Sequence, residues 1–371
     1  MTGMPPIPAV DLRLQHLEVA DEIARGFEEV LADTSFIGGR PVAAFEGAYA
    51  AFVGARHCIG VANGTDALEL SLRAAGLEPG DEVLVPANTF IATALAVSRA
   101  GGHPVLVDCD PVYHLIDVEA AAARVTSHTR FIIPVHLYGQ MAPMERIDAL
   151  ATAHGLAVVE DAAQAQGARR LQYAAGAWGV AAGTSFYPGK NLGAYGDAGA
   201  VTTDSDALAT RIRALRNYGS DVKYHHPETG FNSRLDTLQA VVLGAKLKRL
   251  AAWNAARQEA ARRYDALLAG ISAVSTPRTL DGNEHVYHLY VVRVPNRDAV
   301  VKRLNAEGIG AQIHYPVPIH LQGAFAHLRQ PEGSFPVAEQ AAREILSLPM
   351  FPGITAEQQF RVADTLRRAV A

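Results

Sequence analysis

The sequence predicts an α/β fold: a large domain with a mostly parallel central sheet flanked by helices, and a smaller α+β domain at the C-terminal end. Short apolar runs alternate with helical patterns between residues 57 and 160. Because parallel strands need crossover connections, usually helices, this alternation is typical of a sheet covered on both faces. Beyond residue 250, helical patterns outnumber strands. We therefore expect the N-terminal helices and the large domain in residues 1–250 and the small domain in residues 251–371.

The large domain is expected to begin with two helices. Apolar residues recur at helical spacing from Leu17 to Leu31, and a second stripe follows Pro41, which suits a first helical position. Strands and helices then alternate, and ligands of such sheets bind beyond the carboxyl ends of the strands. We expect strands at 57–62, 82–86, 103–107, 130–135, 157–160 and 183–186, and helices at 66–75, 90–100, 118–125 and 144–154.

The second half of the chain is expected to be mainly helical. Residues 219–234 are polar and irregular, which is typical of a functional loop. Residues 235–268 have a long helical pattern, for which we expect a bend near Trp253. The remaining elements are expected to be helices at 205–217, 297–307, 336–345 and 356–370, and strands at 286–294 and 310–314.

Composition excludes several classes of protein. The formal net charge is −5, so no overall positive field would attract nucleic acid or an anionic membrane. The apolar runs are shorter than the roughly 20 residues that span a bilayer. Residues 1–6 lack the pattern of a signal peptide. Cys58 and Cys109, the only cysteines, are expected to be buried free thiols, which fits a cytoplasmic protein.

Two residues point to a specific chemistry. Lys190 follows a Pro-Gly turn after the predicted strand 183–186, and Asp161 directly follows the predicted strand 157–160. Taken singly, each would more often face water. Together they suit pyridoxal 5'-phosphate (PLP), because a lysine forms a Schiff base with this cofactor. A carboxylate keeps its ring nitrogen protonated, so that the ring withdraws electrons.

Other residues at the same sheet edge suit the phosphate and the ring of PLP. Gly64 and Thr65 open a predicted helix, whose N-terminal N–H groups would bind an anion, although the stretch is equally typical of an ordinary helix cap. Phe90 would stack on a flat ring, although such an aromatic is more often part of a core. Further candidates are Ala163 for the opposite ring face, Gln164 for the ring oxygen, and Ser185 and Asn232 for the phosphate.

Two other kinds of site are disfavoured. His225, His226, His314 and His320 lack the short spacing of zinc ligands, so we expect no metal site. No glycine-rich dinucleotide pattern follows the first strand, which argues against an NAD-dependent dehydrogenase.

The chain resembles the DegT-type nucleotide-sugar aminotransferases, which have PLP fold type I and belong to the aspartate aminotransferase superfamily. The resemblance covers nearly the whole chain. Its most specific pieces are Glu160-Asp161-Ala162-Ala163-Gln164 and Ser185-Phe186-Tyr187-Pro188-Gly189-Lys190. Others lie at residues 7–12, 36–39, 63–68, 88–93, 135–139, 216–220, 232–240 and 314–322.

The resemblance implies roles for individual residues. Lys190 would be the Schiff-base lysine and Asp161 the partner of the pyridine nitrogen. Asn232 would reach the phosphate of a partner subunit, which implies a homodimer with shared active sites. Gly64, Thr65, Phe90, Ala163, Gln164 and Ser185 would contact the cofactor, and Tyr218, Lys223, Tyr224, His314, Tyr315 and His320 the substrate.

Gln164 bears on the substrate. Family members with glutamine there, together with the Phe-Tyr-Pro-Gly-Lys motif, resemble enzymes that aminate C3 of dTDP-linked 3-keto-6-deoxyhexoses, with L-glutamate as amino donor. Many C4 enzymes have histidine at this position instead, and residues 194–198 depart from the commoner pattern. Amination at C4, sugar dehydration and a PLP-binding regulator without turnover remain alternatives. Dehydrating relatives typically replace the lysine with histidine, whereas Lys190 is present here.

Overall fold

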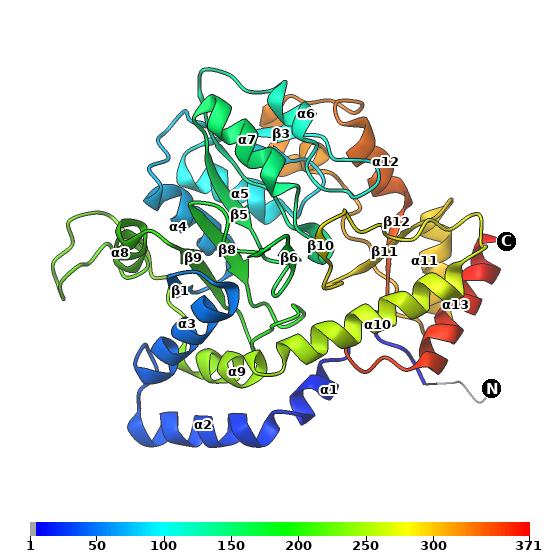
Figure 1. The fold of residues 1–371 in the computed structure, drawn as a ribbon, viewed down its shortest axis with the longest axis horizontal. Helices are drawn as coiled ribbons and strands as arrows, with labels where there is room; N and C mark the ends of the chain where they lie inside the picture. Colours follow the sequence, from blue (N-terminus) through cyan, green and yellow to red (C-terminus); the bar gives the residue numbers. More distant parts are fainter. Residues whose placement is uncertain (1–4) are drawn as a thin grey trace.

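The computed structural model describes residues 5–371 (Figure 1). Met1–Met4, part of the segment that we expect to lack a signal peptide, lie outside the described residues. Among the described residues, no helix is both long enough and apolar enough to cross a membrane. Cys58 and Cys109 are both free and buried, as expected. The cytoplasmic location stays a prediction.

The centre of the molecule is a seven-stranded sheet with the strand order β1-β9-β8-β5-β4-β2-β3. Six strands run in one direction, and β9 is antiparallel to both of its neighbours. The mostly parallel sheet is therefore confirmed. The strands are β1 (His57–Val61), β2 (Glu82–Pro86), β3 (His103–Val107), β4 (Thr129–Ile132), β5 (Ala157–Asp161), β8 (Ala181–Ser185) and β9 (Gly199–Thr203).

Helices cover both faces of this sheet. Successive strand residues point to opposite faces, so Val83 and Val85 of β2 pack in one apolar cluster and Leu84 in another. The first cluster includes Leu68 of α4, and the second includes Ile147 of α7. β2 is thus apolar on both sides, as its sequence predicts. The helices of this region are α4 (Gly64–Ala74), α5 (Ile91–Ala100), α6 (Val118–Ala122), α7 (Met144–His154) and α8 (Asp206–Leu215).

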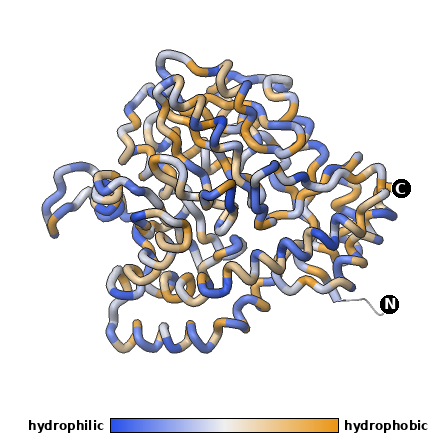
Figure 2. Tube along the Cα trace, in the orientation of Figure 1, coloured by the Kyte–Doolittle hydropathy of each residue, from blue (hydrophilic) through white to orange (hydrophobic). Residues whose placement is uncertain are grey.

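The N-terminal helices pack along the lower edge of the molecule in Figure 1, against the helices that lead to the C-terminal part. Figure 2 shows hydrophilic and hydrophobic residues alternating along α2, as expected for a helix with one buried face. These helices are α1 (Leu12–Leu17), α2 (Ala20–Asp33), α3 (Arg40–Val53), α9 (Thr237–Leu247) and α10 (Leu250–Leu268).

The bend expected near Trp253 is present as a break in the helix just before this residue. The helical segment breaks between Leu247 and Leu250, and Trp253 lies inside α10. Trp253 is buried, and its indole N–H donates to Glu18 Oε2 over 3.0 Å. The large side chain therefore anchors α10 to the end of α1 rather than bending the helix.

The C-terminal part has its own apolar core, which includes Tyr264 of α10, Tyr290 and Leu346. Ile7 from the N-terminal segment packs into the same core and pairs with Ile309. The division into residues 1–250 and 251–371 stays a prediction. The elements here are β11 (Tyr290–Arg293), β12 (Ile345–Leu348), α11 (Arg297–Ala306), α12 (Pro336–Glu344) and α13 (Ala356–Val370).

Two strand expectations in this part need correction. The predicted strand 310–314 forms only a single bridge, between Gln312 and Ser347. The partner of β11 is β12, a fully buried strand that begins directly after α12. The predicted strand 286–294 shortens to β11, because Val286 and Leu289 hydrogen-bond instead to the backbone at Gly139 and Tyr138. Short remaining elements are β6 (Arg169–Arg170), β7 (Tyr173–Ala174), β10 (Asn283–Glu284), η1 (Leu137–Gly139), η2 (Ile319–Leu321) and η3 (Gly323–Leu328).

Candidate active site

The carboxyl ends of β1, β5 and β8 lie at one edge of the sheet. Val61 at the end of β1 and Ser185 at the end of β8 both pair with Gly199 of β9, so the segments that follow them are neighbours. A Cβ on Gly64 would lie 2.6 Å from Ser185 Cβ, closer than real side chains approach. Glycine is therefore required for the start of α4 to lie against Ser185.

The start of α4 fits both of the roles predicted from its sequence, an ordinary helix cap and an anion-binding site. Asn63 is an ordinary helix cap, because its Oδ1 accepts the N–H of Asp66 over 2.9 Å. Gly64 and Thr65 occupy the first turn, where backbone N–H groups lack partners within the helix. These groups remain suited to an anion, with the hydroxyl of Ser185 beside them.

Asp161 ends β5, and its carboxylate is buried. Oδ2 accepts the hydroxyl hydrogen of Thr93 over 2.8 Å, and Oδ1 accepts the N–H of Ala163 over 3.1 Å. Burial raises the pKa of Asp161, although these hydrogen bonds and the charge of Lys190 oppose the rise. A protonated ring nitrogen beside the carboxylate would favour its ionised form.

Lys190 lies in the turn after β8 and is half-buried. Its backbone N–H donates to Tyr187 O over 2.9 Å, which closes the turn. Burial lowers the pKa of the Lys190 amine to about 8, against the opposing charge of Asp161. A substantial fraction of this amine is therefore neutral near physiological pH, as a nucleophile or base requires.

Gln164 is held by two tyrosines. Its Oε1 accepts the backbone N–H of Tyr138 over 2.7 Å, and its Nε2 donates to the hydroxyl of Tyr315 over 3.0 Å. The ring of Tyr315 lies 5.3 Å from that of Phe90, which is 50% exposed. The structure thus brings Phe90, Gln164 and Tyr315 together beside Asp161.

His314 lies next to this group. Its Nδ1 is 2.8 Å from Ser347 Oγ, and the hydroxyl of Tyr138 donates to its carbonyl oxygen over 2.6 Å. Burial and, to a lesser extent, the charge of Lys190 lower the pKa of His314 to about 4. The imidazole is therefore neutral at physiological pH, so it adds no positive charge near Lys190.

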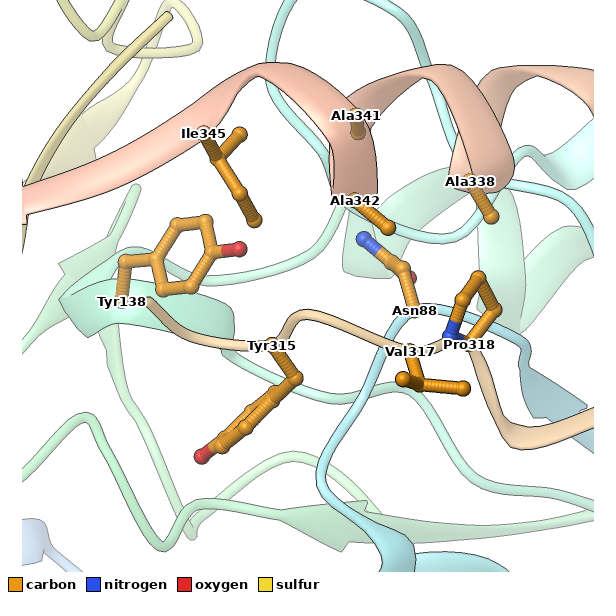
Figure 3. Close-up of a pocket in the computed structure, with 9 residues that line it drawn as sticks. All are labelled: Asn88, Tyr138, Tyr315, Val317, Pro318, Ala338, Ala341, Ala342 and Ile345. Carbon is orange, nitrogen blue, oxygen red and sulfur yellow. The ribbon is translucent and has the colours of Figure 1, made fainter. Parts of the chain in front are cut away.

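A small cavity lies behind Tyr315, between the segment 315–318 and α12 (Figure 3). Tyr138 and Asn88 line it together with alanines of α12, whereas Asp161 and Lys190 do not. This cavity therefore adjoins the cluster through Tyr138 and Tyr315 but is not lined by the lysine or the aspartate.

Five of the remaining candidates are not part of this cluster. Tyr218, Lys223, Tyr224 and Asn232 are exposed in the segment between α8 and α9, and Tyr224 is 85% exposed. Asn232 forms a β-bridge with Asn217, just after α8. Their roles toward a partner subunit or substrate stay predictions. His320 is buried, with Nε2 3.0 Å from Glu339 Oε1 and its ring against Phe335, so we do not assign it to the site.

Residues that the sequence reasoning did not single out support the site. Thr93 fixes one oxygen of Asp161, and its position three residues after Phe90 on α5 would have been the signal. His136 and Glu160 form a buried pair, with Nε2 2.8 Å from Oε2. Burial opposes ionisation of Glu160, but the hydrogen bonds from His136 and from backbone N–H groups lower its pKa. Among residues 5–371, no group of three or more His, Cys, Asp or Glu side chains could hold a metal ion.

The arrangement fits PLP. The cluster provides an amine for the aldehyde, a buried carboxylate for the ring nitrogen, an aromatic ring for one face of the pyridine and a helix start for the phosphate. The burial of the Asp161 carboxylate at the end of β5 is the clearest sign, because a buried carboxylate is stabilised by a cationic ring nitrogen beside it.

Comparison with known proteins gives the same assignment. The profile of the DegT/DnrJ/EryC1/StrS aminotransferase family matches residues 18–367. The chain is 44% identical to the crystal structure of Streptomyces venezuelae DesV in complex with a ketimine intermediate, with a TM-score of 0.96 and 98% of each chain covered.

Two curated relatives match over almost their full length. A pleiotropic regulatory protein of Geobacillus stearothermophilus is 48% identical, with 97% of each chain covered. The dTDP-3-amino-3,4,6-trideoxy-alpha-D-glucose transaminase of Streptomyces venezuelae is 44% identical, covering 98% of this chain and 96% of that protein. With its lysine, its buried aspartate and this extent of similarity, the chain belongs to the DegT/DnrJ/EryC1/StrS aminotransferase family and is a PLP-dependent aminotransferase.

Proposed function

We propose that the protein aminates C3 of a dTDP-linked 3-keto-6-deoxyhexose, with L-glutamate as amino donor. The observation that carries the transamination is the pair of Lys190 and Asp161 at adjacent strand ends, close enough for their charges to interact. Gln164, together with the relative named as a dTDP-3-amino sugar transaminase, supports the choice of C3 and of the nucleotide sugar.

Each residue of the cluster has a part in the reaction. Bound PLP supplies an electron-withdrawing ring that acidifies the Cα of an amino acid. Lys190 would take the Cα proton of glutamate and return it at C4′ of the cofactor, first as base and then as acid. Asp161 keeps the ring nitrogen protonated. In the second half of the reaction, the ketone carbon of the sugar would take the nitrogen and lose its oxygen as water, while Lys190 would move a proton from C4′ to that carbon.

The remaining contacts orient the cofactor. Phe90 and Ala163 would cover the two faces of the ring, and the second N–H of Gln164 Nε2 would donate to the ring oxygen. Gly64, Thr65 and Ser185 would bind the phosphate. Because Gln164 is already fixed by Tyr138 and Tyr315, its amide has one orientation available for the ring oxygen.

The substrate is tested with a panel of nucleotide ketosugars. The protein is first converted to the pyridoxamine form with L-glutamate, and dTDP-3-keto, dTDP-4-keto and UDP-3-keto sugars are then added one at a time. We expect the dTDP-3-keto-6-deoxyhexose to restore the PLP absorbance fastest and to yield a 3-amino sugar by mass spectrometry. Faster reaction of a 4-keto sugar would overturn the C3 assignment, and a dehydrated product without nitrogen would indicate a dehydratase.

A regulator without turnover is the second candidate, because one close relative is named a regulatory protein. A single-turnover experiment with L-glutamate distinguishes the two functions. A regulator would bind PLP without forming pyridoxamine phosphate when L-glutamate is added, whereas the proposed enzyme forms it in a single turnover.

We further propose a homodimer in which Asn232 binds the phosphate in the partner's active site. Its exposure to solvent supports this role. We expect Asn232→Ala to raise the Kd for PLP roughly tenfold, through loss of a hydrogen bond to a charged group. An unchanged Kd, measured by absorbance titration, would remove Asn232 from the site.

Mixed dimers test donation between subunits. Subunits with Lys190→Ala are refolded with subunits that carry Asn232→Ala, at a PLP concentration that saturates only the wild type. If Asn232 acts in the partner's site, one site of each mixed dimer is intact, and random pairing restores about a quarter of the activity. If it acts within its own chain, mixing restores none.

A further inference from the structure

Behind the candidate site, a chain of buried amide side chains joins the Lys190 turn to the segments around Asp161 and Ser185. We propose that Asn191 and Asn254 are positioning residues that, through Gln166, hold the Lys190 turn in register with the two strand ends. The proposal rests on the proposed role of Lys190.

Asn191 directly follows Lys190, and its side chain is only 1% exposed. Its Nδ2 donates to Asn254 Oδ1 over 2.9 Å and to Val286 O over 3.0 Å. Its Oδ1 lies 3.3 Å from His288 Nδ1. Burial, together with the charge of Lys190, lowers the pKa of His288 well below its ordinary value, so the ring is neutral.

Asn254, on α10, links Asn191 to the segment that follows β5. While its Oδ1 accepts from Asn191, its Nδ2 donates to Gln166 O over 2.9 Å. A Cβ on Gly167, whose φ is +87°, would lie 2.6 Å from Asn254 Nδ2. A glycine is therefore required where the backbone meets this amide.

Gln166 completes the chain of hydrogen bonds. Its Nε2 donates to Ala163 O over 3.1 Å and to Ser185 O over 2.8 Å. Ala163 is the candidate for one face of the ring, and Ser185 is a candidate phosphate contact. The lysine turn, the ring contact and the phosphate contact are thus connected through three buried side chains.

The donors and acceptors of these hydrogen bonds allow only one orientation of the Asn191 and Asn254 amides. Asn191 Nδ2 donates to two carbonyl oxygens, so rotating the amide by half a turn would place its own oxygen against Asn254 Oδ1 and Val286 O. Rotating Asn254 would likewise set N–H against N–H and oxygen against oxygen. Because unsatisfied buried polar groups are costly, the amides resist rotation and fix the turn.

The test replaces Asn254 and measures Lys190 in the cofactor-free protein. We expect Asn254→Leu to move the pKa of Lys190 from about 8 toward the ordinary value of 10.5, because a displaced turn admits water to the amine. The pKa is read from the pH dependence of Lys190 acetylation by mass spectrometry. In the holoprotein, we expect the Kd for PLP to rise about tenfold or more.

Gln258→Leu is the matched control. Gln258 lies one turn further along α10, and its amide donates to His285 O over 3.1 Å, without contact to the lysine turn. This variant also loses an amide hydrogen bond, and we expect it to leave the Lys190 pKa and the PLP affinity unchanged. A folded Asn254→Leu protein that matches this control in both measurements would overturn the proposal.

Asn254→Asp provides a second test if the leucine variant does not fold. Its carboxyl group can still accept from Asn191, but it can donate to Gln166 O only when protonated. We expect its Kd for PLP, relative to wild type, to be near one at acidic pH and to rise as the carboxyl ionises. A ratio independent of pH would contradict the hydrogen-bond chain. Failure of the wild type itself to bind PLP would instead refute the proposed function, and the Lys190 pKa would still test the positioning role.

Discussion

Replacing Lys190 by alanine or arginine is expected to reduce kcat by on the order of 10⁴-fold or more, because the proton transfers lose their base and acid. Arginine keeps a positive charge near Asp161 but stays protonated at physiological pH, so it cannot accept the Cα proton. Single-turnover absorbance with L-glutamate measures this effect directly, without a nucleotide sugar.

Lys302→Ala is the control for this experiment, because Lys302 is an exposed lysine on α11, far along the chain from the site. We expect this variant to react at the wild-type rate. A Lys190→Ala protein that is folded and retains most of the wild-type rate would end the assignment of Lys190 as the catalytic lysine.

Asp161→Asn is expected to lower kcat about 10- to 100-fold and to weaken PLP binding, through loss of a charged hydrogen bond to the ring nitrogen. Asparagine has the same shape and can still accept from Thr93 and Ala163 in part. The decreases in kcat and in PLP affinity would therefore result from the lost negative charge and not from a change in side-chain volume. Asp148→Asn on the exposed side of α7 is the matched control and should change neither quantity.

In the cofactor-free protein, Asp161→Asn is expected to change how the stability of the fold depends on pH. Burial raises the folded-state pKa of Asp161 above its ordinary value of 3.8, so the folded state binds more protons than the unfolded state between the two values. Stability of the cofactor-free wild type should therefore fall as pH rises through this window. Asp161→Asn lacks this contribution, so its urea midpoint should fall less over the same pH range. A cofactor-free Asn variant with the same pH slope as the wild type would contradict a raised pKa at Asp161.

The repeating strand and helix patterns of the large domain were sufficient to predict most of its elements. β2, β3 and α7 lie at the predicted bounds, because each is apolar in the expected pattern and is flanked by turn residues. β9 was missed, since Gly199–Thr203 follows a glycine-rich stretch that reads as a turn. β12 was missed because it begins immediately after α12, with no glycine or proline to separate them.

The site was predictable where chemistry restricts residue type, and not where packing decides. Asp161 ends β5 and Lys190 follows the adjacent β8, so the topology brings them together. The sequence alone cannot distinguish His320 from a histidine that contacts substrate. Phe335 and Glu339 approach it only in the folded chain, where they bury its ring. The amides of Asn191 and Asn254 are 63 residues apart, and no sequence pattern indicates their contact.

The most direct test of the account is the visible absorption spectrum of the purified protein with PLP, before and after addition of L-glutamate. We predict a yellow band from PLP bound to Lys190, which L-glutamate converts to the pyridoxamine spectrum. A protein that shows no such band after incubation with PLP, or a band that L-glutamate leaves unchanged, would contradict the assignment of this chain as a glutamate-dependent aminotransferase.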